Sequence, residues 1–399
     1  MGSAVQLAQV DTPVRPSLSS AGRSGADGVR VAPPADLTAK SYILMDYASG
    51  LTLAERDPQI EREPASLTKI MTAYVVFGEI ASGRLSLDEG VLISERAWRT
   101  GMTGASRMFI EVGQTVSVSD LLRGMIVQSG NDASTALAER IAGSESAFVE
   151  LMNRTARDLG MHQTIFANSH GLPSEDLQFT TPLDMALLAR ALIRDYPDLY
   201  QIYSERSFQF AGISQQNRNL LLWREGGFDG LKTGWTSAAG YNLVSSAERD
   251  GRRLIAVVMG IDAPNHQAGG TIRANESQAL IQWGFRFTEP RRVFEAGTVL
   301  ETPRVYRGDV GSVSAGVLSP VWVAVPPGEG DRLRAELDLP GPIEAPLAIG
   351  DTVGELRVLL GSDTIARVPV VALESVELGG WLGRQWDALR LTLRSWRPW

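Results

Sequence analysis

Hydrophobic positions follow two different periods along this chain, and the change between them marks its elements. Residues 41–46, with an apolar run at 42–45, are typical of a buried strand, and after a turn at 48–50 a second strand is expected at 51–54. From Pro64 apolar residues recur at intervals of three and four, which predicts a helix. The same spacing predicts four more helices, at 118–129, 133–142, 145–159 and 182–194.

Strand patterns return at 241–247 and 253–260, around the turn-like segment 249–251, and a helix at 273–285 closes this region. The order of hairpin, helical block, hairpin and helix predicts an α+β domain, with helices packed on an antiparallel sheet, over residues 37–289. Residues 1–36 are rich in Ser, Gly, Pro and Ala without periodicity, so a disordered leader is expected there. This start has no apolar signal segment, and we expect any export signal to have been removed.

After Pro290 short valine-rich runs alternate with Gly and Pro, which predicts a small all-β domain over residues 290–376. Residues 377–399 change character again. Five apolar residues recur there at intervals of four and three, and four arginines occupy the other faces: Leu382, Trp386, Leu389, Leu393 and Trp396, with Arg384, Arg390, Arg394 and Arg397. This pattern predicts an amphipathic helix that lies on an anionic membrane surface, being too short and charged to cross it. The alternative is a helix packed on its own β domain or on a second copy.

Composition narrows the function classes. A net charge of -8 argues against a nucleic-acid partner. The chain has no cysteine, and its three histidines are scattered, so neither a disulfide nor a metal site is expected, and no organic cofactor is implied.

Lysine is rare, and its positions are informative. Of the 38 lysine and arginine residues only three are lysines, namely Lys40, Lys69 and Lys232. Arginine stays protonated near neutral pH, whereas a desolvated lysine can lose its proton. Lys69 stands three residues after Ser66 on the predicted helix, so its amine can reach the hydroxyl and act as a base. An accidental Ser-x-x-Lys on an ordinary helix is the alternative.

Two further motifs follow in order. Ser129-Gly130-Asn131 joins two predicted helices and could present a hydroxyl and a carboxamide to a cleft, although such residues also make ordinary turns. Lys232-Thr233-Gly234 is expected on an edge strand, where it would supply a cation, a hydroxyl and room for a substrate backbone. Taken alone, it could also be a β-turn with an exposed lysine. Together the three motifs predict an acyl-transfer site built on a serine.

The set resembles the penicillin-recognising serine enzymes. The flanking residues resemble low-molecular-mass penicillin-binding proteins of the D-alanyl-D-alanine carboxypeptidase type, of which penicillin-binding protein 5 is an example. The resemblance runs from about residue 37 to the C-terminus, and the segments that carry it are 42–46, 64–72, 128–133, 217–219 and 229–234.

The resemblance implies a role for each matching position. Ser66 would be the acylated nucleophile and Lys69 the general base, with Ser129 and Asn131 lining the cleft. Substrate would be bound by Lys232, Thr233, Gly234, Trp235, Arg218 and His170, the last of which could instead be a structural loop residue. The oxyanion hole would be the backbone N–H groups of Ser66 and Trp235. Trp235 departs from many relatives, which carry histidine or another residue at this position, and its ring leaves fine substrate preference open.

The implied function is removal of the terminal D-alanine from peptidoglycan stem pentapeptides, with covalent inhibition by penicillin. The implied location is the periplasm, at the outer face of the cytoplasmic membrane. Three alternatives stay open: a β-lactamase, a DD-endopeptidase and a catalytically silent wall-binding protein. Against the first, the catalytic Glu-x-x-Leu-Asn segment of class A enzymes is missing, and Glu150 to Asn153 is one residue short of it. The deacylating base, the role of the β domain and a possible homo-oligomer are also open.

Overall fold

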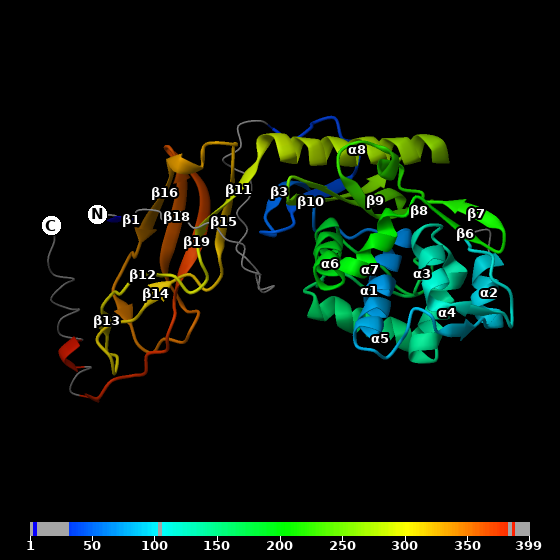
Figure 1. Ribbon diagram of the computed structural model, residues 1–399. Coiled ribbons are helices and arrows are strands. Elements are labelled where there is room, and N and C mark those ends of the chain that lie inside the picture. The colour runs from blue at the N-terminus through cyan, green and yellow to red at the C-terminus, as the bar shows by residue number, and fades with distance from the viewer. Residues whose placement is uncertain (1–2, 6–31, 103–105, 382–384, 388–399) are drawn as a thin grey trace. The chain divides into compact units, whose positions relative to one another are not determined.

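The computed structural model describes residues 3–5, 32–102, 106–381 and 385–387. The chain forms two compact units (Figure 1). The α+β unit contains residues 33–50 and 54–285, and the β unit contains the residues from Arg286 onward together with short earlier segments.

The α+β unit is built on a five-stranded antiparallel sheet with the order β3-β2-β10-β9-β8. Its strands are β2 (Ser41–Asp46), β3 (Thr52–Arg56), β8 (Phe228–Thr236), β9 (Gly240–Arg249) and β10 (Arg252–Ile261). Since β8 ends this order, it lies at one edge, as expected for the strand that carries Lys232. Two small hairpins join β4 (Gly90–Leu92) to β5 (Thr115–Ser117) and β6 (Ser207–Phe210) to β7 (Ile213–Gln216).

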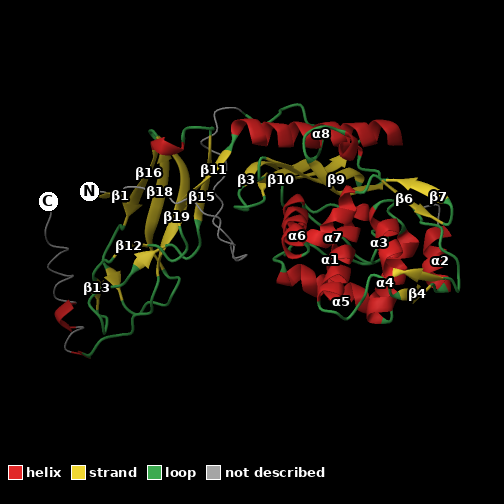
Figure 2. Cartoon of the chain, in the orientation of Figure 1, coloured by secondary structure: helices red, strands yellow, loops and turns green. Residues whose placement is uncertain are grey.

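Helices cover both faces of this sheet. One face carries α8 (His266–Phe287), and the helical block lies on the other (Figure 2). The block consists of α1 (Thr68–Ala81), α2 (Glu95–Met102), α3 (Val118–Ile126), α4 (Asn131–Ala142), α5 (Glu145–Asp158), α6 (Pro182–Asp195) and α7 (Pro197–Tyr200). Short 3₁₀ turns occur at η1 (Ala65–Leu67), η2 (Gln201–Ser204), η3 (Leu220–Trp223) and η4 (Gly330–Arg332), the last in the β unit.

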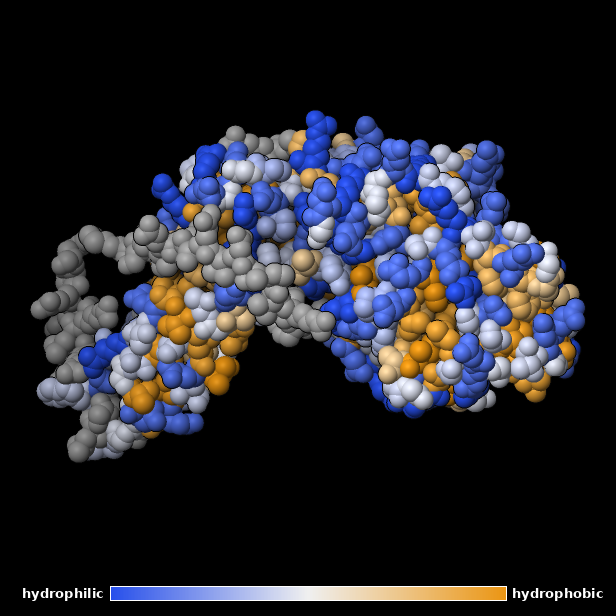
Figure 3. Space-filling model, in the orientation of Figure 1, coloured by the Kyte–Doolittle hydropathy of each residue, from blue (hydrophilic) through white to orange (hydrophobic). Residues whose placement is uncertain are grey.

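The alternation of side chains along the strands explains the two layers. Ile43 and Met45 face the core of the helical block, whereas Leu44 and Leu254 lie against Gly284 of α8. The outer surface of α8 is mostly hydrophilic (Figure 3), because its exposed positions are polar. Side-chain caps fix where three helices begin: Ser117 for α3, Ser144 for α5 and Thr181 for α6.

The β unit has a six-stranded sheet with the order β1-β16-β18-β19-β14-β12, a pair β11-β15 and a parallel pair β13-β17. Its core is rich in valine, as the sequence pattern predicts. The strands are β1 (Ser3–Val5), β11 (Glu289–Phe294), β12 (Val299–Glu301), β13 (Val305–Tyr306), β14 (Ala315–Gly316), β15 (Val321–Val325), β16 (Leu333–Asp338), β17 (Ile343–Glu344), β18 (Thr352–Leu360) and β19 (Asp363–Ala372).

The structure differs from the expected disordered leader at three residues. Ser3–Val5 form β1, which pairs antiparallel with β16. The physical reason is that β16 would otherwise be an edge strand, whose free N–H and C=O groups accept an extended segment. Most of the amphipathic helix expected at 377–399 lies outside the described residues. No helix within the described ranges combines the length and apolar character needed to cross a bilayer.

Candidate active site

Ser66 lies where a 3₁₀ turn leads directly into α1. It is the middle residue of η1, and Lys69 is the second residue of α1. Side chains three residues apart align in a 3₁₀ turn, so Lys69 lies beneath the serine. Its Nζ is 3.0 Å from Ser66 Oγ. Ser66 is partly exposed, whereas Lys69 is fully buried.

The amine of Lys69 has two further partners. It donates to Asn131 Oδ1 at 2.7 Å and to the backbone carbonyl of His170 at 2.6 Å. Burial holds the pKa of Lys69 well below that of an ordinary lysine; the charge of Arg218 lowers it further, and Asp132 opposes the shift. A lowered pKa favours the neutral amine, which is the form that can accept a proton from a serine.

The backbone of the Ser129-Gly130-Asn131 segment is unusual at its first residue. The left-handed conformation falls on Ser129, with φ +68°, and not on Gly130. Gly130 is needed for close approach instead, because a Cβ there would come within 2.8 Å of Asp132 Oδ1 and 3.1 Å of Met108 N. Ser129 and Asn131 are both buried, and Asn131 begins α4.

Lys232 and Thr233 lie on β8 and are almost fully buried. Burial lowers the pKa of Lys232 well below its ordinary value, and the charges of Lys69, Arg218 and Arg273 lower it further. A Cβ at Gly234 would lie 3.1 Å from the carbonyl oxygen of Pro64, so glycine lets the strand pack tightly against the serine turn, the turn η1 that contains Ser66.

Arg218 and Trp235 are exposed. The positive charge of Arg218 lowers the pKa of both buried lysines, Lys69 and Lys232. The indole of Trp235 is 43% exposed and meets His266 edge-on at 4.3 Å between ring centroids, with Tyr241 at 5.8 Å. These two aromatic neighbours therefore hold the Trp235 ring next to the Lys232-Thr233-Gly234 motif.

His170 belongs to a buried loop, residues 168–171, that touches the serine turn; we call it the His170 loop. Its ring accepts the N–H of Leu172 at Nδ1, and burial lowers the pKa of His170 to about 4, with Lys69 adding to the shift and Glu145 opposing it. The next residue, Gly171, has a left-handed backbone, and a Cβ on it would lie 1.8 Å from the carbonyl oxygen of Ala65. The loop can thus pack against the backbone that precedes Ser66.

The structure brings four predicted residues into direct contact, namely Ser66, Lys69, Asn131 and the backbone of His170. Lys232 and Arg218 interact with this group through charge.

Sequence reasoning missed Arg273, which is buried on α8 and donates to the carbonyl oxygen of Gly234 at 3.2 Å. Burial and Arg218 lower the pKa of Arg273 to about 10. In a chain whose cations are nearly all arginine, no sequence signal marks this one.

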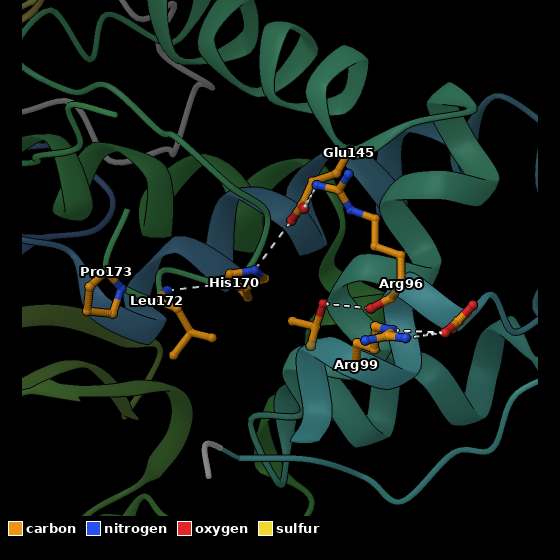
Figure 4. A pocket seen from close by; sticks show the side chains of 8 residues that line it. Arg96, Arg99, Glu145, His170, Leu172 and Pro173 are labelled. Carbon is orange, nitrogen blue, oxygen red and sulfur yellow. Dashed lines mark hydrogen bonds and ion pairs between the residues drawn. The ribbon is translucent and has the colours of Figure 1, made fainter. Parts of the chain in front are cut away.

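An open cavity of about 620 Å³ lies between α2 and the His170 loop (Figure 4). Its lining includes Arg96, Arg99, Glu145, His170 and Leu172. Glu145 was also missed by sequence reasoning, and it lies close to the ring of His170. Within the described residues no cluster of His, Cys, Asp or Glu could hold a metal ion.

Two family matches cover most of the chain. Residues 27–263 match the family described as D-alanyl-D-alanine carboxypeptidase, and residues 289–378 match the penicillin-binding protein 5 C-terminal domain. D-alanyl-D-alanine carboxypeptidase DacC of Escherichia coli (strain K12) is 43% identical over 363 residues, which cover 90% of this chain and 89% of that protein.

Solved structures agree with the family matches. Penicillin-binding protein 5 from Haemophilus influenzae superposes with a TM-score of 0.73 at 41% identity, covering 87% of this chain and 99% of that one. Penicillin-binding protein D2 from Listeria monocytogenes, in its ampicillin-bound form, gives 0.57 at 30% identity and covers 63% of this chain and 100% of that one. The chain therefore belongs to the family of D-alanyl-D-alanine carboxypeptidases and combines its catalytic domain with a C-terminal domain of the penicillin-binding protein 5 type.

Proposed function

We propose that this chain is a serine D-alanyl-D-alanine carboxypeptidase that removes the terminal D-alanine from peptidoglycan stem pentapeptides. The observation that carries the proposal is the buried amine of Lys69, which lies 3.0 Å from Ser66 Oγ and has a lowered pKa. Membership of the carboxypeptidase family supports the choice of substrate.

In the proposed reaction Lys69 Nζ takes the proton from Ser66 Oγ while this oxygen attacks the carbonyl carbon between the two D-alanines. The backbone N–H groups of Ser66 and Trp235 receive the oxyanion. The C–N bond then breaks, and the proton held by Lys69 passes to the amine of the departing D-alanine, which leaves Lys69 neutral again. Water hydrolyses the resulting ester and regenerates the serine hydroxyl. Lys69 is the candidate that activates this water.

The terminal carboxylate of the substrate would be attracted by a group of cations. Arg218 and Arg273 lower the pKa of Lys232, and Arg218 lowers that of Arg273, so these charges act on a common region, where a bound carboxylate would favour protonated Lys232. Thr233 offers a hydroxyl on the same strand. Ser129 and Asn131 would line the opposite wall, where Asn131 also orients Lys69.

Penicillin would acylate Ser66 and block the site, and the ampicillin-bound form of the Listeria relative supports this. A β-lactamase is less well supported, since Glu150 is exposed on α5. A DD-endopeptidase would use the same site on cross-linked stems. A catalytically silent protein would not need the contact between Lys69 and Ser66.

The experiment is release of D-alanine from a synthetic stem pentapeptide by the full chain, compared with Ser66→Ala. The proposal expects release that depends on Ser66 and is blocked by penicillin. Cleavage of a cross-linked stem-peptide dimer without release of D-alanine from the pentapeptide would favour the endopeptidase. Rapid turnover of penicillin would favour the β-lactamase.

We also propose that the chain acts in the periplasm, on the outer face of the cytoplasmic membrane, with its C-terminal residues as the surface anchor. The exposed Trp381 and Trp386 support an apolar contact near this end. Trp suits a membrane interface because its ring is apolar while its N–H can stay hydrated.

A further inference from the structure

Lys69 makes three contacts, and their number matches what a neutral amine can offer. A neutral amine has two hydrogens and one lone pair. Asn131 Oδ1 and the carbonyl oxygen of His170 are acceptors only, and they lie 2.7 Å and 2.6 Å from Nζ. If each takes one N–H, the lone pair is left for the hydroxyl of Ser66 at 3.0 Å. The position of the His170 carbonyl therefore helps to set the direction of the lone pair.

The His170 carbonyl lies in a loop with little regular structure, so other groups must fix it. Ser169, one residue earlier, donates both its Oγ–H and its backbone N–H to Glu145 Oε1, at 2.7 Å and 3.1 Å. The carbonyl of Ser169 accepts from Thr72 of α1 and Ser134 of α4, each at 2.6 Å. Glu145 is thus the side chain that ties this loop to α5, while the loop's carbonyls tie it to the helices that carry Lys69 and Asn131.

Glu145 is itself held firmly. It follows the N-cap Ser144 as the first residue of α5, where the helix dipole stabilises a carboxylate. Its other oxygen, Oε2, accepts from Arg96 of α2 at 2.8 Å, and the ring of His170 lies 3.5 Å from Oε1 (Figure 4). Burial alone would raise the pKa of Glu145, but His170, Ser169 and Arg96 together lower it. Glu145 is therefore ionised and accepts hydrogen bonds from two residues, Ser169 and Arg96.

We propose that Glu145 is a positioning residue for catalysis: through Ser169 it places the His170 carbonyl that orients the lone pair of Lys69 toward Ser66. This inference rests on the proposed function, because it deepens the role of Lys69 as the base. Arg96 supports Glu145 from the cavity side and is the weaker part of the device, because its side chain is 63% exposed.

The test uses the full chain and measures the rate constant of acylation by penicillin as a function of pH. The fraction of chains able to react is counted in each sample. Counting reactive molecules separates a slower site from a partly unfolded sample. Glu145→Ala should slow acylation about 10-fold or more, since misplacing a reacting group by ~1 Å can cost up to about 10²-fold. Glu145→Gln should recover most of the rate, because an amide oxygen still accepts from Ser169. Glu150→Ala, an exposed glutamate on the same helix, is the matched control and should react like the unaltered chain.

The pH profile gives a readout that a merely structural role would not move. Arg218 and Asp132 act on the pKa of Lys69, and Lys232 and His170 are linked to it through charge; both variants leave these four residues in place. In Glu145→Ala the His170 carbonyl is expected to move away from the amine, and a weaker acceptor for the protonated amine favours the neutral form. The acidic limb of the profile should therefore move to lower pH in Glu145→Ala, while the plateau falls.

Two results would overturn the inference alone: an unchanged rate constant and limb in Glu145→Ala, or a loss in Glu145→Gln as large as in Glu145→Ala. Failure of the unaltered chain to react at Ser66 would contradict the proposed function, and this inference with it.

Discussion

Replacement of Lys69 by arginine is the sharpest substitution at the scale of single residues. Arginine keeps the positive charge but cannot lose a proton near neutral pH. If Lys69 is the base, acylation by penicillin should fall by about 10²-fold or more in Lys69→Arg. Stopped-flow acylation with a fluorescent penicillin measures this. A rate near that of the unaltered chain would mean that Lys69 acts only through its charge.

The buried histidine predicts how stability depends on pH. The pKa of His170 is about 4 in the folded chain and 6.5 as the reference for an unfolded one. Between these values the unfolded state binds the extra proton, so the free energy of unfolding rises with pH and falls as pH drops through this window. The lowered pKa of Glu145 removes further stability only below its ordinary value of 4.5.

Urea unfolding at about pH 7 and about pH 5 tests this expectation, with His170→Gln as the comparison. The decrease in the free energy of unfolding between the two pH values should be smaller in the variant. An equal decrease in both proteins would show that other groups cause it.

Carboxylate recognition can be separated from the chemistry of acylation. Lys232→Ala and Arg218→Ala should weaken reaction with a pentapeptide that bears a free terminal carboxylate, because each removes a cation from the group near Lys69. The loss in kcat/KM should shrink on a peptide whose terminal carboxylate is amidated. Equal losses on both peptides would refute recognition of the carboxylate by these residues.

Single residues were predictable from the sequence where a motif marked them. Ser66, Lys69 and Lys232 stood out because their residue types are chemically specific and lysine is rare here. Arg273 and Glu145 did not, because one is an arginine among many and the other is an ordinary helix-start glutamate. Their importance comes from contacts with Gly234 and Ser169, residues that lie far from them in the sequence.

At the scale of elements, the fit of the His170 loop against the serine turn can be tested with one methyl group. In Gly171→Ala the new Cβ would overlap the carbonyl oxygen of Ala65, so the loop must move. We expect destabilisation beyond the about 1–3 kcal/mol typical of overpacking, together with slower acylation. Gly143→Ala is the matched control, since it is also left-handed but has open space around it. Gly143→Ala should lower the free energy of unfolding by only about 1–2 kcal/mol and leave acylation unchanged. Equal effects at both sites would mean that the left-handed backbone, and not the contact with Ala65, causes the loss.

Element boundaries show where pattern reading succeeds. Strand β2 begins and ends as expected, because an uninterrupted apolar run has one interpretation in a sheet covered on both faces. The helix expected at 118–129 ends at Ile126, since Ser129 takes a left-handed backbone for the turn. Helix α8 begins at His266, seven residues before the expected start, where its glycines obscure the helical period. Short elements such as α2 and β14 carry too few residues for a period to appear.

At the scale of the whole molecule, the C-terminal segment is expected to bind anionic membranes. The described part is tied to the β unit: Asp309 and Glu377 exchange hydrogen bonds, and Asp387 accepts the backbone N–H of Arg307 at 2.8 Å. A chain that ends at Gly380 therefore keeps the first of these contacts.

Vesicle co-sedimentation should show that the full chain binds vesicles containing anionic lipid, that binding falls with salt, and that truncation after Gly380 abolishes it. Each arginine near the surface is expected to contribute about 1 kcal/mol. Hydrolysis of a soluble peptide should not change. If the truncated chain sediments as well as the full one, the anchor lies elsewhere.

Peptide mapping of the penicillin adduct by mass spectrometry tests the central claim most directly. The account predicts one adduct per chain, located on the peptide that contains Ser66 and absent from Ser66→Ala. An adduct on another residue, or one that persists in Ser66→Ala, would contradict it.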